Sequence, residues 1–168
     1  MLNNNSLHHR LVLALFVSIT FTACGFHLRG VNEITFKNIF IQGNSLSISK
    51  ELNQSFKSNG VRVVDNQIDA ELLLEMLNEN SEKRILSLSA SGVVREYEIN
   101  YRVSFRTRKP SDPVWNNPQT VQSRRNFSYN DNALLSKLDE ETKLNADMHS
   151  EAIREILRRL SAIKLTAK

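Results

Sequence analysis

Apolar and polar residues alternate most strictly between Arg95 and Arg106. Every second residue of this segment is large and apolar: Tyr97, Ile99, Tyr101, Val103 and Phe105. The residues between them are polar or charged. A period of two sustained over a whole segment is typical of a β-strand with one buried face. We therefore predict a strand here whose other face is polar.

Three further segments are rich in β-branched, aromatic or alternating apolar residues and predict strands: residues 34–43, 70–90 and 120–130. Val61–Val64 is either another short strand or an extended lead-in to the next segment. The region Ala70–Asn78 also fits a helix, because Leu73 and Leu77 fill positions between the alternating apolar residues. Lys109–Trp115 contains two prolines and predicts a loop.

Two segments carry apolar residues at helical spacing. Ile48, Leu52 and Phe56 recur every four residues, and Gly60 follows where a helix commonly ends. A second helix occupies about the last 30 residues of the chain. Its apolar stripe comprises Leu144, Met148, Ala152, Ile153, Ile156, Leu157, Leu160 and Ile163. Acidic residues complement the dipole of a first helical turn, so we expect this helix to begin at Asp139–Glu141.

The order of strand, helix, strands and helix predicts an α+β fold. Two helices can cover one face of an antiparallel or mixed sheet and bury its apolar side chains. Residues 34–168 are long enough for one such domain. We expect a single domain, since the sequence holds neither an internal repeat nor a low-complexity tract.

The first 23 residues have the order of a secretory signal peptide. Arg10 is the only charged side chain before Cys24, and Leu11–Thr20 is free of charge and mostly apolar. This run is too short to cross a bilayer, which takes about 20 apolar residues. A buried N-terminal strand or helix is the alternative, but neither would need a charge, an apolar run and small residues in this order.

Cys24 is the only cysteine in the chain. Exported proteins usually pair their cysteines, so a single one suggests a modification site. The segment Phe21–Gly25 resembles a bacterial lipobox, which predicts cleavage before Cys24 and attachment of diacylglyceryl and N-acyl groups to it. Gly25 favours the outer membrane, since an Asp there would signal retention in the inner membrane. Residues 24–33 would form the lipidated tether.

The remaining residues do not indicate catalysis. The formal net charge is only +4, which does not indicate nucleic-acid binding. His27 and His149 are far apart in the sequence, and neither has a second ligand at metal-binding spacing. The five glycines form no phosphate-binding loop. We predict a protein that is not an enzyme and has no metal or cofactor besides the acyl groups on Cys24.

Basic residues outnumber acidic ones, seven to three, between Arg95 and Tyr129. Arg102 and Arg106 lie on the polar side of the alternating strand, and Arg124 and Arg125 lie in the strand expected to pair with it. A solvated sheet face is one interpretation. The other is a site for a phosphorylated partner, because arginine binds phosphate through two hydrogen bonds. At an outer membrane that partner would be lipopolysaccharide.

Three segments in order resemble the LPS-assembly lipoprotein LptE family: "ACGFHLRG" at 23–30, "REYEINYRVSF" at 95–105, and the closing segment at 124–160. The resemblance implies two helices on a four-stranded sheet. It also implies a lipid-anchored protein that plugs the outer-membrane β-barrel LptD, helps it assemble and binds lipopolysaccharide during transfer to the cell surface. Lys137, in the expected loop before the last helix, matches a family position for lipopolysaccharide contact. A structural lipoprotein of another envelope assembly machine is the alternative.

Overall fold

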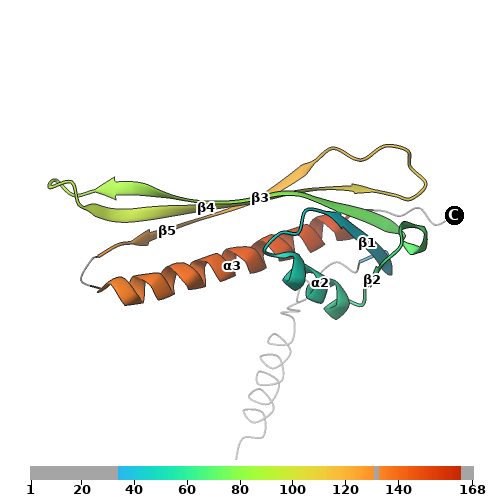
Figure 1. The fold of residues 1–168 in the computed structure, drawn as a ribbon, viewed down its shortest axis with the longest axis horizontal. Coiled ribbons are helices and arrows are strands. Elements are labelled where there is room, and N and C mark those ends of the chain that lie inside the picture. Colours follow the sequence, from blue (N-terminus) through green and yellow to red (C-terminus); the bar gives the residue numbers. More distant parts are fainter. Residues whose placement is uncertain (1–33, 131–132, 164–168) are drawn as a thin grey trace, which may run out of the picture. The chain divides into compact units, whose positions relative to one another are not determined.

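Five strands form one mixed sheet in the order β2-β1-β3-β4-β5 (Figure 1). The structure is a computed structural model that describes residues 34–130 and 133–163. The signal peptide, Cys24 and the tether lie outside the described residues. The elements are β1 (Asn38–Gly43), α2 (Ser49–Ser58), β2 (Arg62–Val64), a short 3-10 helix (Gln67–Asp69), β3 (Leu72–Leu88), β4 (Val94–Arg108), β5 (Gln119–Ser128) and α3 (Leu134–Ser161).

The expected four-stranded sheet is corrected to five strands, and β2 is the additional one. β1 runs parallel to both β2 and β3, whereas β3, β4 and β5 are antiparallel neighbours. α2 connects β1 to β2, as a parallel pair requires a crossover. β2 has only three residues, too few for an alternating pattern to appear. The sequence therefore left its state open.

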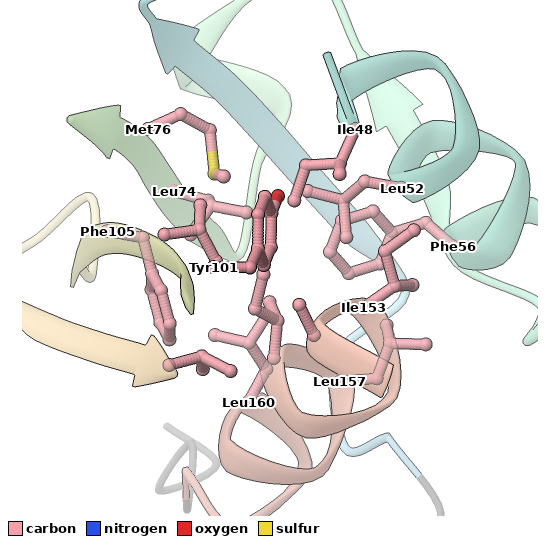
Figure 2. Packing of buried hydrophobic residues seen from close by; sticks show 14 of the residues in the cluster. Ile48, Leu52, Phe56, Leu74, Met76, Tyr101, Phe105, Ile153, Leu157 and Leu160 are labelled. Atoms are coloured by element: carbon pink, nitrogen blue, oxygen red, sulfur yellow. The ribbon is translucent and has the colours of Figure 1, made fainter. Parts of the chain in front are cut away.

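Both helices cover the same face of the sheet, and the core lies between them and the strands (Figures 1 and 2). The alternating face of β4 is confirmed, because Ile99, Tyr101, Val103 and Phe105 are all buried. Leu72, Leu74 and Met76 of β3 face the same core. α2 contributes Leu52 and Phe56, and α3 contributes its apolar stripe from Met148 to Leu160. One buried cluster thus unites every layer.

An extra residue in β3 changes which side chains face the helices. The pairing with β4 shifts between Met76 and Asn78, so Leu77 is the bulged residue. Before the bulge, even-numbered residues of β3 face the core. After it, odd-numbered residues such as Glu79 do. Gly43 ends β1 beside the bulge, and Asn44 closes the corner by donating its backbone N–H to the carbonyl of Met76 at 3.0 Å.

Glu79 thereby enters the helix-covered side of the sheet as a partly buried acid. It accepts hydrogen bonds from the backbone N–H of Ser47 (2.6 Å), the Ser47 hydroxyl (2.5 Å) and the Tyr101 hydroxyl (2.6 Å). Burial raises the pKa of Glu79, but the bonds from Ser47 and Tyr101 outweigh it and the net pKa is lowered. Burial, together with the bond to Glu79, raises the pKa of Tyr101. This cluster holds the β1–α2 loop against the sheet.

α3 begins at Leu134, five residues before the expected start at Asp139. Asp139–Glu141 therefore lie beyond the first turn, and Lys137 lies inside the helix rather than in a loop. The first turns escaped the pattern because Leu135 and Leu138 are exposed and extend no buried stripe. Among the described residues, neither helix is long and apolar enough to cross a membrane.

Candidate functional site

The predicted basic residues divide between the two faces of the sheet. Arg102, Arg106 and Arg124 occupy even positions of β4 and β5, opposite the helices, on what we call the open face. Arg125 pairs with Ile99 on the helix-covered face, and Lys137 belongs to α3. The five cations therefore do not form one site. Adjacent residues of a strand point to opposite faces, which separates Arg124 from Arg125.

Each of the five cations has a carboxylate partner within 4.0 Å. The pairs are Arg102–Glu82, Arg106–Glu75, Arg124–Glu98, Arg125–Glu151 and Lys137–Glu140. The sequence did not indicate these partners, because most of them lie on a different strand or helix from the cation that they pair with. All five candidate cations are thus members of ion pairs, and they differ in how firmly they are held.

Arg106 is held firmly at one end of the open face. Its Nε donates to Glu75, and this bond, partly opposed by burial, lowers the pKa of Glu75. Trp115, from the loop between β4 and β5, lies 5.0 Å from the Arg106 guanidinium and 5.2 Å from that of Arg108, measured to the ring centroid. Cation–π contacts of this kind fix both guanidinium groups in place. Arg106 is therefore poorly placed to bind a new anion.

Arg102 and Arg124 are held most loosely. Arg124 Nε lies 3.8 Å from the Glu98 carboxylate, and Arg102 Nη2 lies 3.9 Å from that of Glu82, both beyond hydrogen-bond distance. Their side chains are 56% and 43% exposed. Glu98, by contrast, is only 5% exposed, and Arg84 already pairs with it at 2.8 Å. These two arginines are diagonal neighbours across β4 and β5, and both can reach solvent anions.

Arg125 and Lys137 bind elements of the domain to each other. Arg125 donates to Glu151 of α3 at 2.7 Å, and Ser123 donates to the same carboxylate at 2.6 Å. The Ser123 bond, with help from Arg125 and against burial, lowers the pKa of Glu151. Lys137 donates to Glu140 at 2.7 Å and to Ser128 of β5 at 3.1 Å, and its side chain is only 18% exposed. Their contacts attach α3 to β5.

Apolar side chains are exposed at the hairpin end of the sheet, a feature that the sequence reasoning did not identify. The hairpin between β3 and β4 exposes Ile85, Leu86, Leu88 and Val93, and the first turns of α3 expose Leu135 and Leu138. The bond from Lys137 to Ser128 places the start of α3 at the same end. The alternation in "RILSLSASG" was a signal for a strand, but not for which of its residues would stay uncovered.

Lys83 joins this end of the sheet to α3. Its Nζ lies 2.5 Å from Glu141 of α3 and 4.4 Å from the ring centroid of Tyr97 on β4. Tyr97 in turn packs against Phe127 of β5 and Tyr129. In the described part of the chain, no three His, Cys, Asp or Glu side chains are grouped so as to hold a metal ion. The geometry offers charged and apolar contact surfaces.

A family model described as "LptE: Lipopolysaccharide-assembly" matches residues 36–160. The LPS-assembly lipoprotein LptE of Photorhabdus laumondii is 25% identical, over 93% of this chain and 87% of the relative. The solution NMR structure of an uncharacterized lipoprotein B from Nitrosomonas europaea has a TM-score of 0.70 at 34% identity, covering 82% of this chain and 91% of that one. The crystal structure of the rare lipoprotein B from Shewanella oneidensis has a TM-score of 0.67 at 23% identity. It covers 75% of this chain and 95% of that one.

Proposed function

The chain belongs to the LptE family of lipopolysaccharide-assembly proteins, and we propose that it is an outer-membrane lipoprotein that binds lipopolysaccharide during its transfer to the cell surface. The observation that carries the proposal is the extent of the family match, which runs from β1 to the end of α3. The proposed protein partner is the β-barrel LptD, which the protein plugs and helps to assemble. Both roles depend on binding, without covalent chemistry.

The chemistry of the open face supports lipopolysaccharide as the ligand. Lipopolysaccharide carries phosphates and acyl chains in one molecule. Arg102 and Arg124 offer exposed guanidinium groups, which bind phosphate through paired hydrogen bonds. The exposed apolar residues of the β3–β4 hairpin provide surface for acyl chains at one end of the same sheet. Lys137 stays a candidate contact from the family resemblance, although its ammonium group is shared by Glu140 and Ser128.

The proposed attachment to the outer membrane depends on Cys24. One acyl chain anchors a protein only marginally, because each buried methylene contributes about 0.8 kcal/mol, whereas two or three chains hold it stably. A diacylglyceryl group plus an N-acyl chain on Cys24 would therefore keep the protein at the membrane. The tether, residues 24–33, would connect this anchor to the domain.

Purification of the full-length protein from detergent-solubilised outer membranes tests the proposal. We expect a stoichiometric complex with a barrel of the LptD class, and we expect lipopolysaccharide to bind it. Cys24→Ser should leave the precursor uncleaved and unlabelled by radioactive fatty acid. A mature-sized, membrane-bound Cys24→Ser protein would contradict the anchor. A complex with small lipoproteins and no barrel would favour a structural role in another envelope assembly machine.

A further inference from the structure

The two edges of the sheet differ in length. β2 has three residues at one edge, whereas β5 has ten at the other, and among the described residues β5 pairs only with β4. An unpaired strand edge presents a row of backbone N–H and C=O groups that can pair with another chain. The outer side of β5 is therefore a ten-residue pairing edge without a bulge, whereas the part of β3 beyond Met76, which β1 leaves unpaired, is interrupted by shifts in register.

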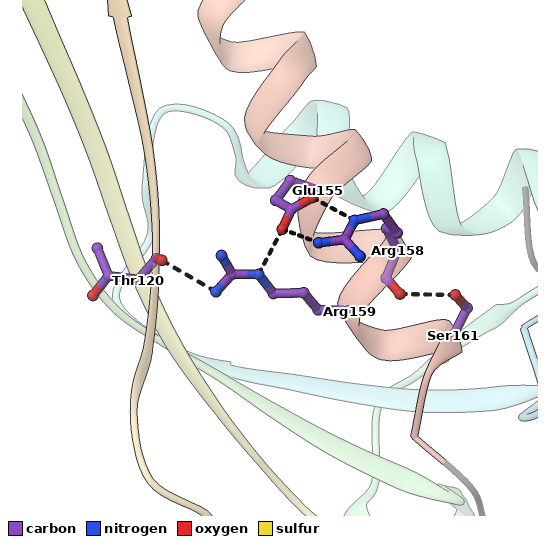
Figure 3. A network of polar contacts seen from close by, with 5 residues as sticks. All are labelled: Thr120, Glu155, Arg158, Arg159 and Ser161. Atoms are coloured by element: carbon purple, nitrogen blue, oxygen red, sulfur yellow. Dashed lines mark hydrogen bonds and ion pairs between the residues drawn. The ribbon is translucent and has the colours of Figure 1, made fainter.

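The register shows which backbone groups point outward. Tyr129 donates its backbone N–H to the carbonyl of Arg95 at 2.8 Å, so odd-numbered residues of β5 form the hydrogen-bonded pairs with β4. Two side-chain bonds agree with this assignment. The carbonyl of Thr120 accepts from Arg159 at 3.1 Å, as Figure 3 shows, and that of Arg124 accepts from Arg125 at 2.9 Å. Both carbonyls thus point away from β4.

The outer row of β5, which we call the β5 edge, comprises Thr120, Gln122, Arg124, Asn126 and Ser128, and all five residues are exposed. Among the described residues, no group accepts a hydrogen bond from the backbone N–H of Gln122, Arg124 or Asn126. β5 contains no proline or bulge, two devices that commonly protect an edge strand, and its protection is limited to the charges of Arg124 and Arg125. In the described part of the chain, arginine side chains partly block two carbonyls of this row, those of Thr120 and Arg124.

We propose that an extended, acidic segment of a partner protein adds to the β5 edge as a further strand of the sheet. β5 carries Arg124 and Arg125 and no acidic residue, so two copies of this edge would bring like charges together. A segment with Asp or Glu opposite Arg124 would instead gain a cross-strand ion pair. The wall of a closed barrel has no free edge, so the segment must come from a loop, a terminus or an open sheet.

This inference rests on the proposed function, because the partner tested is the barrel protein that we expect to co-purify. The added strand and a lipopolysaccharide phosphate would both contact the Arg124 guanidinium, which is available to either because Glu98 holds it only loosely. The backbone row, however, is independent of lipopolysaccharide. A readout on backbone amides therefore separates strand addition from binding of a phosphorylated ligand.

Amide hydrogen exchange of the full-length protein, alone and in the co-purified complex, provides the primary test. We expect the amides of Gln122, Arg124 and Asn126 to exchange at least about tenfold more slowly in the complex, because they acquire acceptors there. Equal exchange in both states would overturn the inference and leave the proposed function intact. Failure of any barrel to co-purify with the wild-type protein would overturn both.

Proline substitution provides the matched test by mutation. Gln122→Pro removes an outward N–H, and edge strands tolerate proline at such positions, so β4–β5 pairing should survive. Gln122→Ala is the control, since it loses the same side-chain bond to Asn100 but keeps the amide. We expect Gln122→Pro to reduce barrel recovery at least fivefold at an unchanged melting temperature, and Gln122→Ala to match wild type. Equal recovery of the two variants would overturn strand addition at this position.

Discussion

Gly43 shows how a single residue sets the corner between β1 and the β3 bulge. Its φ of +98° lies in the region that favours glycine. A Cβ at this position would collide with the backbone carbonyl of Met76, which cannot move aside as a flexible side chain could. Gly92, in the β3–β4 hairpin, also has a positive φ of +81°, but its Cβ would meet open space. The two glycines therefore separate backbone strain from steric clash.

We predict that Gly43→Ala lowers the free energy of unfolding by about 3 kcal/mol, from unfavourable φ plus a backbone clash. Gly92→Ala should cost only about 1 kcal/mol, because it has the strain without the clash. Urea unfolding of both variants measures the difference. Equal losses would show that β1 and β3 separate at the corner without penalty.

At this scale the sequence predicts which residues are buried better than which residues pair. The alternation of the sequence alone shows which side chains of β4 face the core. It does not show the carboxylate partners of the arginines, because Glu98 contacts Arg84 and Arg124 only when β3, β4 and β5 are aligned in the sheet. The basic residues of the candidate site could therefore be identified from the sequence, but the carboxylates that pair with them could not.

Among the elements, α3 carries a charged network in its last two turns that responds to acid. Glu155 accepts bonds from Arg158 at 2.6 Å and Arg159 at 2.8 Å, and Arg159 continues to the carbonyl of Thr120 (Figure 3). The bonds from Arg158, then those from Arg159, lower the pKa of Glu155 to about 2 from its ordinary value of 4.5. The network joins the end of α3 to β5.

A lowered folded-state pKa stabilises the protein above the unfolded-state value and ceases to do so as pH falls through the folded-state value. We therefore predict that Glu155→Gln is less stable than wild type at pH 7, and that the two converge between about pH 4.5 and pH 2. Urea unfolding across that range measures the convergence. Glu82→Gln makes the same charge change 3.9 Å from Arg102 and serves as control. A constant difference between Glu155→Gln and wild type at all pH values would contradict the prediction.

The sequence predicted a helix or strand correctly where apolar residues repeat at a regular spacing over many residues and form one buried face. The alternation in β4 and the stripe in α3 extend over many residues, and both elements are confirmed. β2 was left open because three residues carry no period. The start of α3 was misplaced because its first leucines face outward, and the bulge at Leu77 is a change of register that composition does not encode.

For the domain as a whole, the separation of the cations onto two sides makes their roles testable. We predict that Arg102→Gln with Arg124→Gln weakens lipopolysaccharide binding by about fivefold. Two exposed ionic contacts at about 0.5 kcal/mol each give this factor. Equilibrium binding of labelled lipopolysaccharide to the purified protein measures it, and added salt should weaken wild-type binding as well.

Arg125→Gln is the control, since it removes a charge from the helix side. It should lower the melting temperature, because Arg125 attaches α3 to β5, while changing the affinity less than twofold. Lys137→Gln tests the other candidate contact, and a larger loss of affinity in it than in the Arg102 and Arg124 variant would locate the contact at Lys137, as the family resemblance implies.

The pairing of Arg124 with buried Glu98 has a consequence for how long a ligand would stay. A phosphate that binds this guanidinium takes the place of a carboxylate, so the event is an exchange of counter-ions. Part of the gain is offset by the attraction that Glu98 gives up, although Arg84 continues to neutralise that carboxylate. Such a surface favours brief residence over storage, which would suit the proposed transfer of lipopolysaccharide to the cell surface.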